Sequence, residues 1–321
     1  MKFKGVDFWP HHIRLPIMQF RFVASGISVA IAVLAAALLM TKGLNFGIDF
    51  KGGSLFEVRQ TSGPLDIAKL RDKLGGLGLG DVQIQGLDIP GEALIRVELQ
   101  KSEPGDKAEK AQQAVEQKVR GALGDGFEFR RTEIVGPAVS GELKEAGIIA
   151  VLCAVVGILF YIWFRFEWQF GVAAILALVH DITITLGVFA LIGLDFGLSE
   201  VAALLTLAGY SINDTVVVFD RIRENLRRYK KMPLVELMNQ SINETLSRTV
   251  VTSGTTFVAV LALYVFGTEV IRGFSFAMLF GILIGTWSSI FVATPFLLWI
   301  GVKRDWSGEP TAAAAAAKAR P

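Results

Sequence analysis

The chain has 321 residues, of which 52% are hydrophobic and only 19% are charged, whereas about a quarter of the residues of an average soluble protein are charged. The formal net charge is +2, and the basic residues flank apolar runs instead of forming a stripe, which excludes a nucleic-acid-binding protein. The single cysteine, Cys153, lies in an apolar stretch and excludes an internal disulfide bond.

The chain opens with a basic segment, residues 1–21, which is followed by an apolar run at 22–40. About 20 apolar residues suffice for a helix to cross the hydrocarbon core of a bilayer, so 22–40 is predicted to be the first transmembrane helix. A cleaved signal peptide also begins with basic and then apolar residues. This run is long for a signal peptide and ends in LLMTK, without a cleavage site of small residues, which favours the transmembrane helix.

The next region, residues 41–145, is predicted to be a separate α+β domain. Alternating apolar residues predict strands at 54–59, 82–87, 93–99 and 127–134. Helical periodicity predicts amphipathic helices at 65–74 and 107–123. The resulting order of strands and helices is that of a ferredoxin-like domain. The region contains no His, no Cys and no Gly-rich phosphate loop, so we expect a binding or docking module with no metal and no cofactor.

A second apolar region, residues 146–301, is predicted to contain five more transmembrane helices, and Trp residues at the ends of some of them are typical of membrane interfaces. These helices are predicted at residues 146–164, 170–192, 198–219, 250–266 and 274–300. The fold class is therefore a bundle of six transmembrane helices with an inserted domain. An even number of spans places both termini on the same side of the membrane.

The segment between the fourth and fifth spans, residues 220–249, determines the predicted orientation. It carries seven basic residues: Arg221, Arg223, Arg227, Arg228, Lys230, Lys231 and Arg248. By the positive-inside rule this segment and both termini are cytoplasmic, and the inserted domain lies outside the cytoplasm. An apolar stripe that begins at Leu234 predicts an amphipathic helix at the membrane surface. The Ala-rich tail, residues 302–321, is predicted to be disordered.

Ionisable residues inside the predicted spans are candidates for function, since each costs about 2.5–3.5 kcal/mol on insertion scales. His180 and Asp181 lie near the middle of the third span. Asp214 and its neighbour Asn213 lie on one face of the fourth, together with Thr206 and Tyr210. In the fifth span, one face carries Arg248, Thr252, Thr255 and Thr256. The fourth and fifth spans are antiparallel, so these two polar faces can meet.

Two interpretations of Asp214 and Arg248 remain open. The two side chains can form a static ion pair that clamps the helices, as His180 and Asp181 can form a hydrogen-bonded packing pair. Alternatively, Asp214 and Arg248 form a proton relay together with Asn213, Asp181 and His180. Arginine stays charged, and protonation of Asp214 would release Arg248 and change how the helices pack.

Three motifs resemble those of the SecD and SecF family. Residues 44–53 read LNFGIDFKGG, which is similar to the motif that opens the family's periplasmic domain. Residues 209–225 read GYSINDTVVVFDRIREN and residues 246–256 read LSRTVVTSGTT, which resemble the fourth-helix and fifth-helix signatures of the SecF branch. The His180-Asp181 pair resembles its third-helix motif. The resemblance covers nearly the whole chain, apart from its two tails.

The resemblance implies a multi-pass protein of the bacterial inner membrane that works with SecD, within the superfamily of resistance-nodulation-division transporters. It implies that the pair uses the proton motive force to draw preproteins through the SecYEG channel after the ATP-driven SecA step, with YajC and YidC as further partners. Asp214 and Arg248 match the residues implicated in proton flow, and no catalytic residue and no cofactor is implied.

Two other functions compete with protein export. A small-molecule or lipid exporter of the same superfamily would be expected to have twelve helices and two external domains in one chain. A non-transporting assembly scaffold would be expected to tolerate Asn in place of Asp214.

Overall fold

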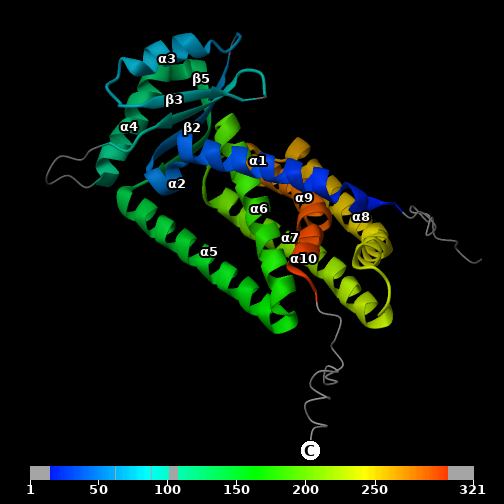
Figure 1. Cartoon of the computed structure of the whole chain (residues 1–321). Helices are drawn as coiled ribbons and strands as arrows, with labels where there is room; N and C mark the ends of the chain where they lie inside the picture. Colours follow the sequence, from blue (N-terminus) through cyan, green and yellow to red (C-terminus); the bar gives the residue numbers. More distant parts are fainter. Residues whose placement is uncertain (1–14, 62, 88, 101–107, 303–321) are drawn as a thin grey trace, which may run out of the picture. The chain divides into compact units, whose positions relative to one another are not determined.

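The computed structural model describes residues 15–61, 63–87, 89–100 and 108–302. It divides into two compact units (Figure 1). The helical unit comprises residues 1–44, 154–194 and 202–321, and the mixed α/β unit comprises residues 45–153 and 195–201. The predicted disordered tail lies outside the described residues, apart from Val302.

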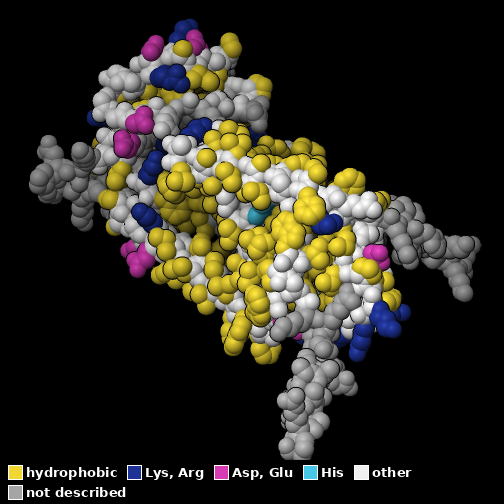
Figure 2. All heavy atoms as spheres, viewed as in Figure 1, with side chains coloured by type: hydrophobic (Ala, Val, Ile, Leu, Met, Phe, Trp, Pro, Cys, Tyr) yellow, Lys and Arg dark blue, Asp and Glu magenta, His cyan; other side chains and the backbone are white. Residues whose placement is uncertain are grey.

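Six segments of the described chain are long and apolar enough to cross a membrane, which confirms the predicted number of spans. They contain the helices α1 (Arg21–Thr41), α5 (Pro137–Arg165), α6 (Trp168–Ile192), α7 (Leu198–Arg228), α8 (Leu234–Phe266) and α9 (Glu269–Ser288), the last continued by the π-helix η3 (Ser289–Ala293) and α10 (Thr294–Ile300). Hydrophobic side chains cover much of the surface visible in Figure 2. Such a surface is typical of helices that face lipid.

Within the helical unit, α6 packs against both α1 and α9, and α8 packs against α9. Gly187 of α6 lies directly against Ala35 of α1. A Cβ added at Gly187 would lie 2.4 Å from the Cβ and 2.7 Å from the Cα of Ala35. The absence of a side chain at residue 187 therefore allows the two backbones to touch.

We expect Gly187→Ala to lower the free energy of unfolding by about 1–3 kcal/mol, because the added methyl group forces α1 and α6 apart. The measurement is an unfolding titration of the full chain in detergent. Gly26→Ala in α1 is the matched control, since nothing lies within 4 Å of a Cβ at that position. Equal stability of the two variants would show that the contact between α1 and α6 is not tight.

The helix α8 differs from the prediction of a surface helix followed by a separate span. It is one continuous helix, and Leu237, Met238 and Ile242 of the apolar stripe are buried. They belong to a hydrophobic core that also contains Ile17 and Met18 of the 3-10 helix η1 (Ile17–Phe20). The stripe therefore packs against protein, because the segment before α1 and the end of α7 cover it.

The mixed unit has the predicted ferredoxin-like topology. Its antiparallel sheet has the order β3-β4-β2-β5, from β2 (Gly53–Gln60), β3 (Val82–Gly86), β4 (Glu92–Val97) and β5 (Phe127–Val135). Two helices, α3 (Ile67–Gly75) and α4 (Ala108–Leu123), contribute Leu70, Leu74, Val115 and Val119 to one core with the sheet. Further elements are α2 (Ile48–Lys51) and the 3-10 helix η2 (Gly124–Gly126).

Asp66 sets the first residue of α3. Its carboxylate Oδ1 accepts hydrogen bonds from the backbone N–H groups of Ala68 and Lys69, each at 3.1 Å. This arrangement is an N-cap, which satisfies two of the free N–H groups at a helix start. The hydrogen bond from Lys69 is the main cause that lowers the pKa of Asp66 below its ordinary value of 3.8.

The N-cap makes the stability of α3 depend on pH. A lowered pKa means that the ionised cap stabilises the folded helix fully above about pH 3.8, and that this contribution is lost as the pH falls through the lower folded value. Hydrogen exchange of the α3 amides, corrected for the intrinsic exchange rate, should show that α3 opens faster at pH values below about 3.8 than above. Asp66→Asn keeps an acceptor and should remove this pH dependence. If it leaves the dependence unchanged, another carboxyl group is responsible.

The mixed unit also contains a short parallel pair of strands that was not predicted from the sequence. It joins β1 (Asn45–Phe46) to β6 (Asp195–Phe196). The Asn45 amide donates to the Asp195 carboxylate at 2.6 Å, and the N–H of Gly47 donates to the carbonyl of Phe196 at 2.9 Å. The LNFGIDFKGG motif is thereby bonded to the segment that begins α7.

Candidate functional site

Asp181 is the most completely enclosed ionisable residue of the candidate site. It lies on α6, its side chain is 0% exposed, and three groups bind its carboxylate. Nδ1 of His180 lies 2.9 Å from Oδ1, while the hydroxyls of Ser211 and Ser288 donate to Oδ2 at 2.6 and 2.7 Å. Asp181 therefore connects α6, α7 and α9.

Asp214 is held in a similar way one turn along α7 from Ser211. The Thr249 hydroxyl of α8 donates to Oδ1 at 2.8 Å, and the Ser289 hydroxyl donates to Oδ2 at 2.7 Å. All three residues are buried. Asp214 is thus a buried carboxylate that connects α7, α8 and the start of η3 through neutral donors.

Consecutive serines serve the two carboxylates. Ser288 donates to Asp181 and Ser289 donates to Asp214. Neighbouring residues of a helix point about 100° apart, because one turn takes 3.6 residues. Two adjacent serines on one helix can therefore reach carboxylates on two different sides of it.

The backbone of this last helix departs from α geometry at Ser289, where η3 begins. Pro295 lacks an N–H group, so the carbonyl of Phe291 cannot receive the usual helical bond from four residues later. The Ser25 hydroxyl of α1 donates to that carbonyl at 2.9 Å. Single turns of π-helix are frequently found at functional sites.

The expected contact between Asp214 and Arg248 takes a different form. Arg248 is exposed, and within the described part of the chain no ion pair or hydrogen bond joins it to Asp214. Thr252, Thr255 and Thr256 donate their hydroxyls to carbonyls of their own helix. The two polar faces meet through Thr249, which neighbours Arg248. The static ion pair is therefore absent from this structure.

Asn213 is exposed beside buried Asp214 and is not among the described residues that hydrogen-bond to the two carboxylates. The predicted site residues did not include the hydroxyl donors Ser211, Thr249, Ser288 and Ser289. The signal for Ser211 and Thr249 was their place inside the two long motifs. Nothing in the pattern separated Ser288 and Ser289 from serines that bond only to their own helix.

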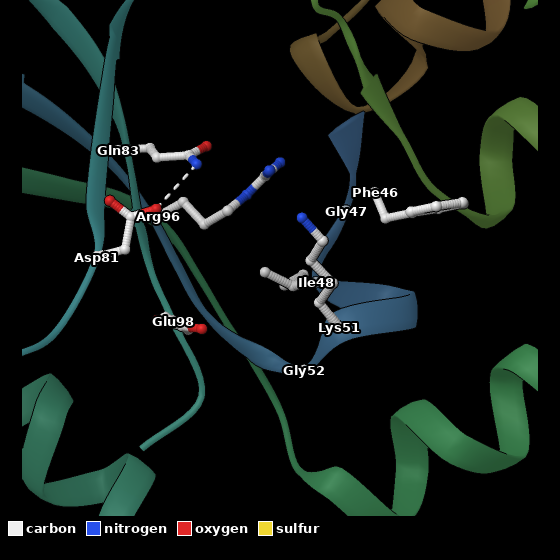
Figure 3. Close-up of a pocket in the computed structure, with 9 residues that line it drawn as sticks. All are labelled: Phe46, Gly47, Ile48, Lys51, Gly52, Asp81, Gln83, Arg96 and Glu98. Atoms are coloured by element: carbon white, nitrogen blue, oxygen red, sulfur yellow. Dashed lines mark hydrogen bonds between the residues drawn. The ribbon is translucent and has the colours of Figure 1, made fainter. Parts of the chain in front are cut away.

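The mixed unit contains a small cavity of about 70 Å³. Lys51 of α2 and Arg96 of β4 point toward the same space, with Asp81, Gln83 and Glu98 nearby (Figure 3). Arg96 forms an ion pair with Asp195 of β6, and burial lowers the pKa of Arg96. The charges of the lining balance, so the cavity offers no clear preference for an anion or a cation.

Two of the three glycines of the LNFGIDFKGG motif, Gly47 and Gly52, line this cavity, and Gly53 follows directly. A Cβ at Gly53, where φ is +125°, would lie 2.5 Å from the carbonyl oxygen of Val97. The start of β2 therefore requires glycine, both for its backbone angle and for its closeness to β4. In the described residues, no group of three or more His, Cys, Asp or Glu side chains could hold a metal ion.

Comparison with known families identifies the motifs. Residues 114–303 match the family described as protein export membrane protein SecD/SecF, C-terminal, and residues 37–59 match the SecD/SecF GG motif. The chain belongs to the SecD/SecF family. It is 47% identical to the protein translocase subunit SecF of Cereibacter sphaeroides over 88% of each chain. It is 46% identical to that of Desulfurispirillum indicum, over 89% of this chain and 91% of the relative.

Longer relatives contain a second part. The protein translocase subunit SecDF of Brucella abortus is 42% identical over 92% of this chain, which spans only 38% of that relative. The crystal structure of SecDF, a translocon-associated membrane protein from Thermus thermophilus, matches with a TM-score of 0.81 and 36% identity. The match covers 91% of this chain and 39% of the SecDF chain. Along most of its length this chain is therefore similar to protein translocase subunits SecF, and it has a SecDF-like fold.

Proposed function

We propose that this chain is the proton-coupled SecF subunit of a SecD–SecF complex that completes protein translocation across the bacterial inner membrane. The similarity to the SecDF of Brucella abortus supports a partner, since that relative combines both names in one chain of which this chain spans 38%. The partner is SecD, which contributes a related core of six helices.

The observation that carries the proposal is the chemistry around Asp214. Its hydrogen-bond partners in the described chain are hydroxyls, and a hydroxyl can donate or accept a hydrogen bond. Thr249 and Ser289 can therefore remain bonded whether Asp214 is ionised or protonated. A carboxylate locked in an ion pair would instead leave a buried arginine without its partner on protonation.

Arg248 provides the response to the proton. It stays charged and lies exposed on α8, next to Thr249. When Asp214 is ionised, attraction draws the guanidinium toward the carboxylate. When Asp214 is protonated, this attraction ends and the residues around Arg248 and Asn213 are free to rearrange. The proton thus changes the contacts between α7, α8 and a neighbouring SecD.

His180 and Asp181 act as a positioning pair in this proposal. Asp181 fixes Ser211 and Ser288, and each of these lies within three residues of Asp214 or its donor Ser289. The pair thereby holds the two helices that carry the proton site at a defined separation.

The proposed orientation in the membrane follows from the distribution of basic residues. The basic segment between α7 and α8 and both termini lie in the cytoplasm, and the mixed unit lies in the periplasm. The complex acts on a preprotein in the SecYEG channel after the SecA step, with YajC and YidC as associated proteins. It needs no cofactor.

The test measures the export of a secreted reporter by pulse-chase labelling in cells depleted of their own SecF. The chain is supplied together with SecD from its own source, which removes mismatch between species as an explanation. We expect export to recover, and an uncoupler that collapses the proton motive force to remove the gain while SecA remains supplied with ATP. Recovery that survives the uncoupler would contradict proton coupling.

A further inference from the structure

An open cavity of about 420 Å³ lies at the ends of α5 and α7 in the helical unit. This volume is within the range of ligand sites, about 300–1,000 Å³. Its lining consists of charged residues: Arg165, Asp220, Arg223, Glu224, Arg227 and Arg228. It is separate from the Asp181 and Asp214 carboxylates.

The lining has an excess of positive charge. Four arginines face two carboxylates, and both carboxylates are already engaged. Asp220 accepts from Arg165 at 2.7 Å, and Glu224 accepts from Arg221, outside the lining, at 2.6 Å. Glu167, in the turn between α5 and α6, adds one acid close to Arg223 and Arg227, and burial raises its pKa. The lining together with Glu167 therefore has a net positive charge.

Exposed aromatic residues lie next to this cavity in the sequence and mark the level of the membrane surface. Trp163 is 72% exposed, Phe164 is 81% exposed and Trp168 is 65% exposed. They precede and follow Arg165, the residue at which the apolar run of α5 ends. Aromatic side chains at this position are typical of the boundary between acyl chains and headgroups.

We propose that this cavity binds the phosphodiester headgroup of an anionic membrane phospholipid. Arginine binds phosphate oxygens with paired N–H donors, and Arg227 and Arg228 are exposed residues of the lining. The acyl chains lie along the exposed aromatic residues of α5, which a free phosphate ion would not contact. Basic pockets between transmembrane helices provide this type of lipid site. The inference rests on membrane insertion and not on proton coupling.

The test uses native mass spectrometry of the full chain in detergent, titrated with phosphatidylglycerol or with phosphatidylcholine of the same acyl chains. The double variant Arg227→Gln/Arg228→Gln removes two cavity residues. The control Lys230→Gln/Lys231→Gln removes the same charge from the adjacent loop, outside the lining. We expect the first variant to bind phosphatidylglycerol about thirty-fold more weakly, at about 1 kcal/mol per basic residue, and the control to bind as wild type does.

Unchanged binding of phosphatidylcholine by the first variant would show that the variant is folded. Equal loss in both double variants would overturn the site in favour of general attraction to a basic surface. Displacement of phosphatidylglycerol by equimolar inorganic phosphate would show a free-phosphate site. If a polyglutamate peptide bound more tightly than phosphatidylglycerol does, the cavity would be a docking site for an acidic protein. Either result would overturn the lipid assignment.

Discussion

Asp214→Asn is expected to abolish nearly all of the export that depends on this chain while leaving its abundance in the membrane unchanged. Asparagine has the shape of aspartate and keeps a carbonyl oxygen for Thr249 or Ser289. The hydroxyl partners can reorient to suit an amide, since each can donate or accept. The variant therefore folds, but it can no longer take up and release a proton.

The measurement is pulse-chase export of the reporter at matched membrane abundance, in the depleted cells supplied with SecD. Asp72→Asn is the matched control, because it makes the same chemical change at an exposed residue of α3, away from both buried carboxylates and from the arginine-lined cavity. We expect the control to export as the wild type does. Normal export by Asp214→Asn would contradict the proton relay and would favour a scaffold that does not move protons.

Asp181→Ala is expected to have the second large effect, on stability. Asp181 is fully buried, and its removal leaves the hydroxyls of Ser211 and Ser288 and the ring of His180 without their shared acceptor. A buried polar group without a partner costs about 1–3 kcal/mol. For Ser211 and His180 together the free energy of unfolding should fall by about 2–6 kcal/mol, whereas the Ser288 hydroxyl keeps the carbonyl of Gly285 as an acceptor at 3.1 Å.

The loss would be measured by an unfolding titration in detergent and by membrane abundance in cells. Asn213→Ala provides the control, since Asn213 is exposed on the adjacent helix and is not among the described residues that hydrogen-bond to either carboxylate. If Asp181→Ala were as stable as the control but failed to support export, Asp181 would belong to the proton pathway and not to the positioning of its helices.

The sequence alone determined the features that depend on local patterns. Long apolar runs gave six spans because a bilayer demands a fixed length, and alternation of apolar residues gave the four long strands of the mixed unit. The motifs around Asp214 and Asp181 identified the family. The start of α5 was predicted too late, because polar first turns look like a loop in a search for apolar runs, and α8 was predicted as two helices because its first half is amphipathic.

Only the tertiary structure decided which groups touch. A serine or threonine in a transmembrane helix can donate to its own backbone or to another helix, and the sequence does not distinguish these. Thr252 donates to a carbonyl of its own helix, whereas Thr249 donates to Asp214 on α7. The pairing of β1 with β6 could not be predicted, because a strand of two residues is too short to show an alternating pattern. The position of Ser288 and Ser289 between two buried carboxylates depends on how three helices pack, which no local pattern encodes.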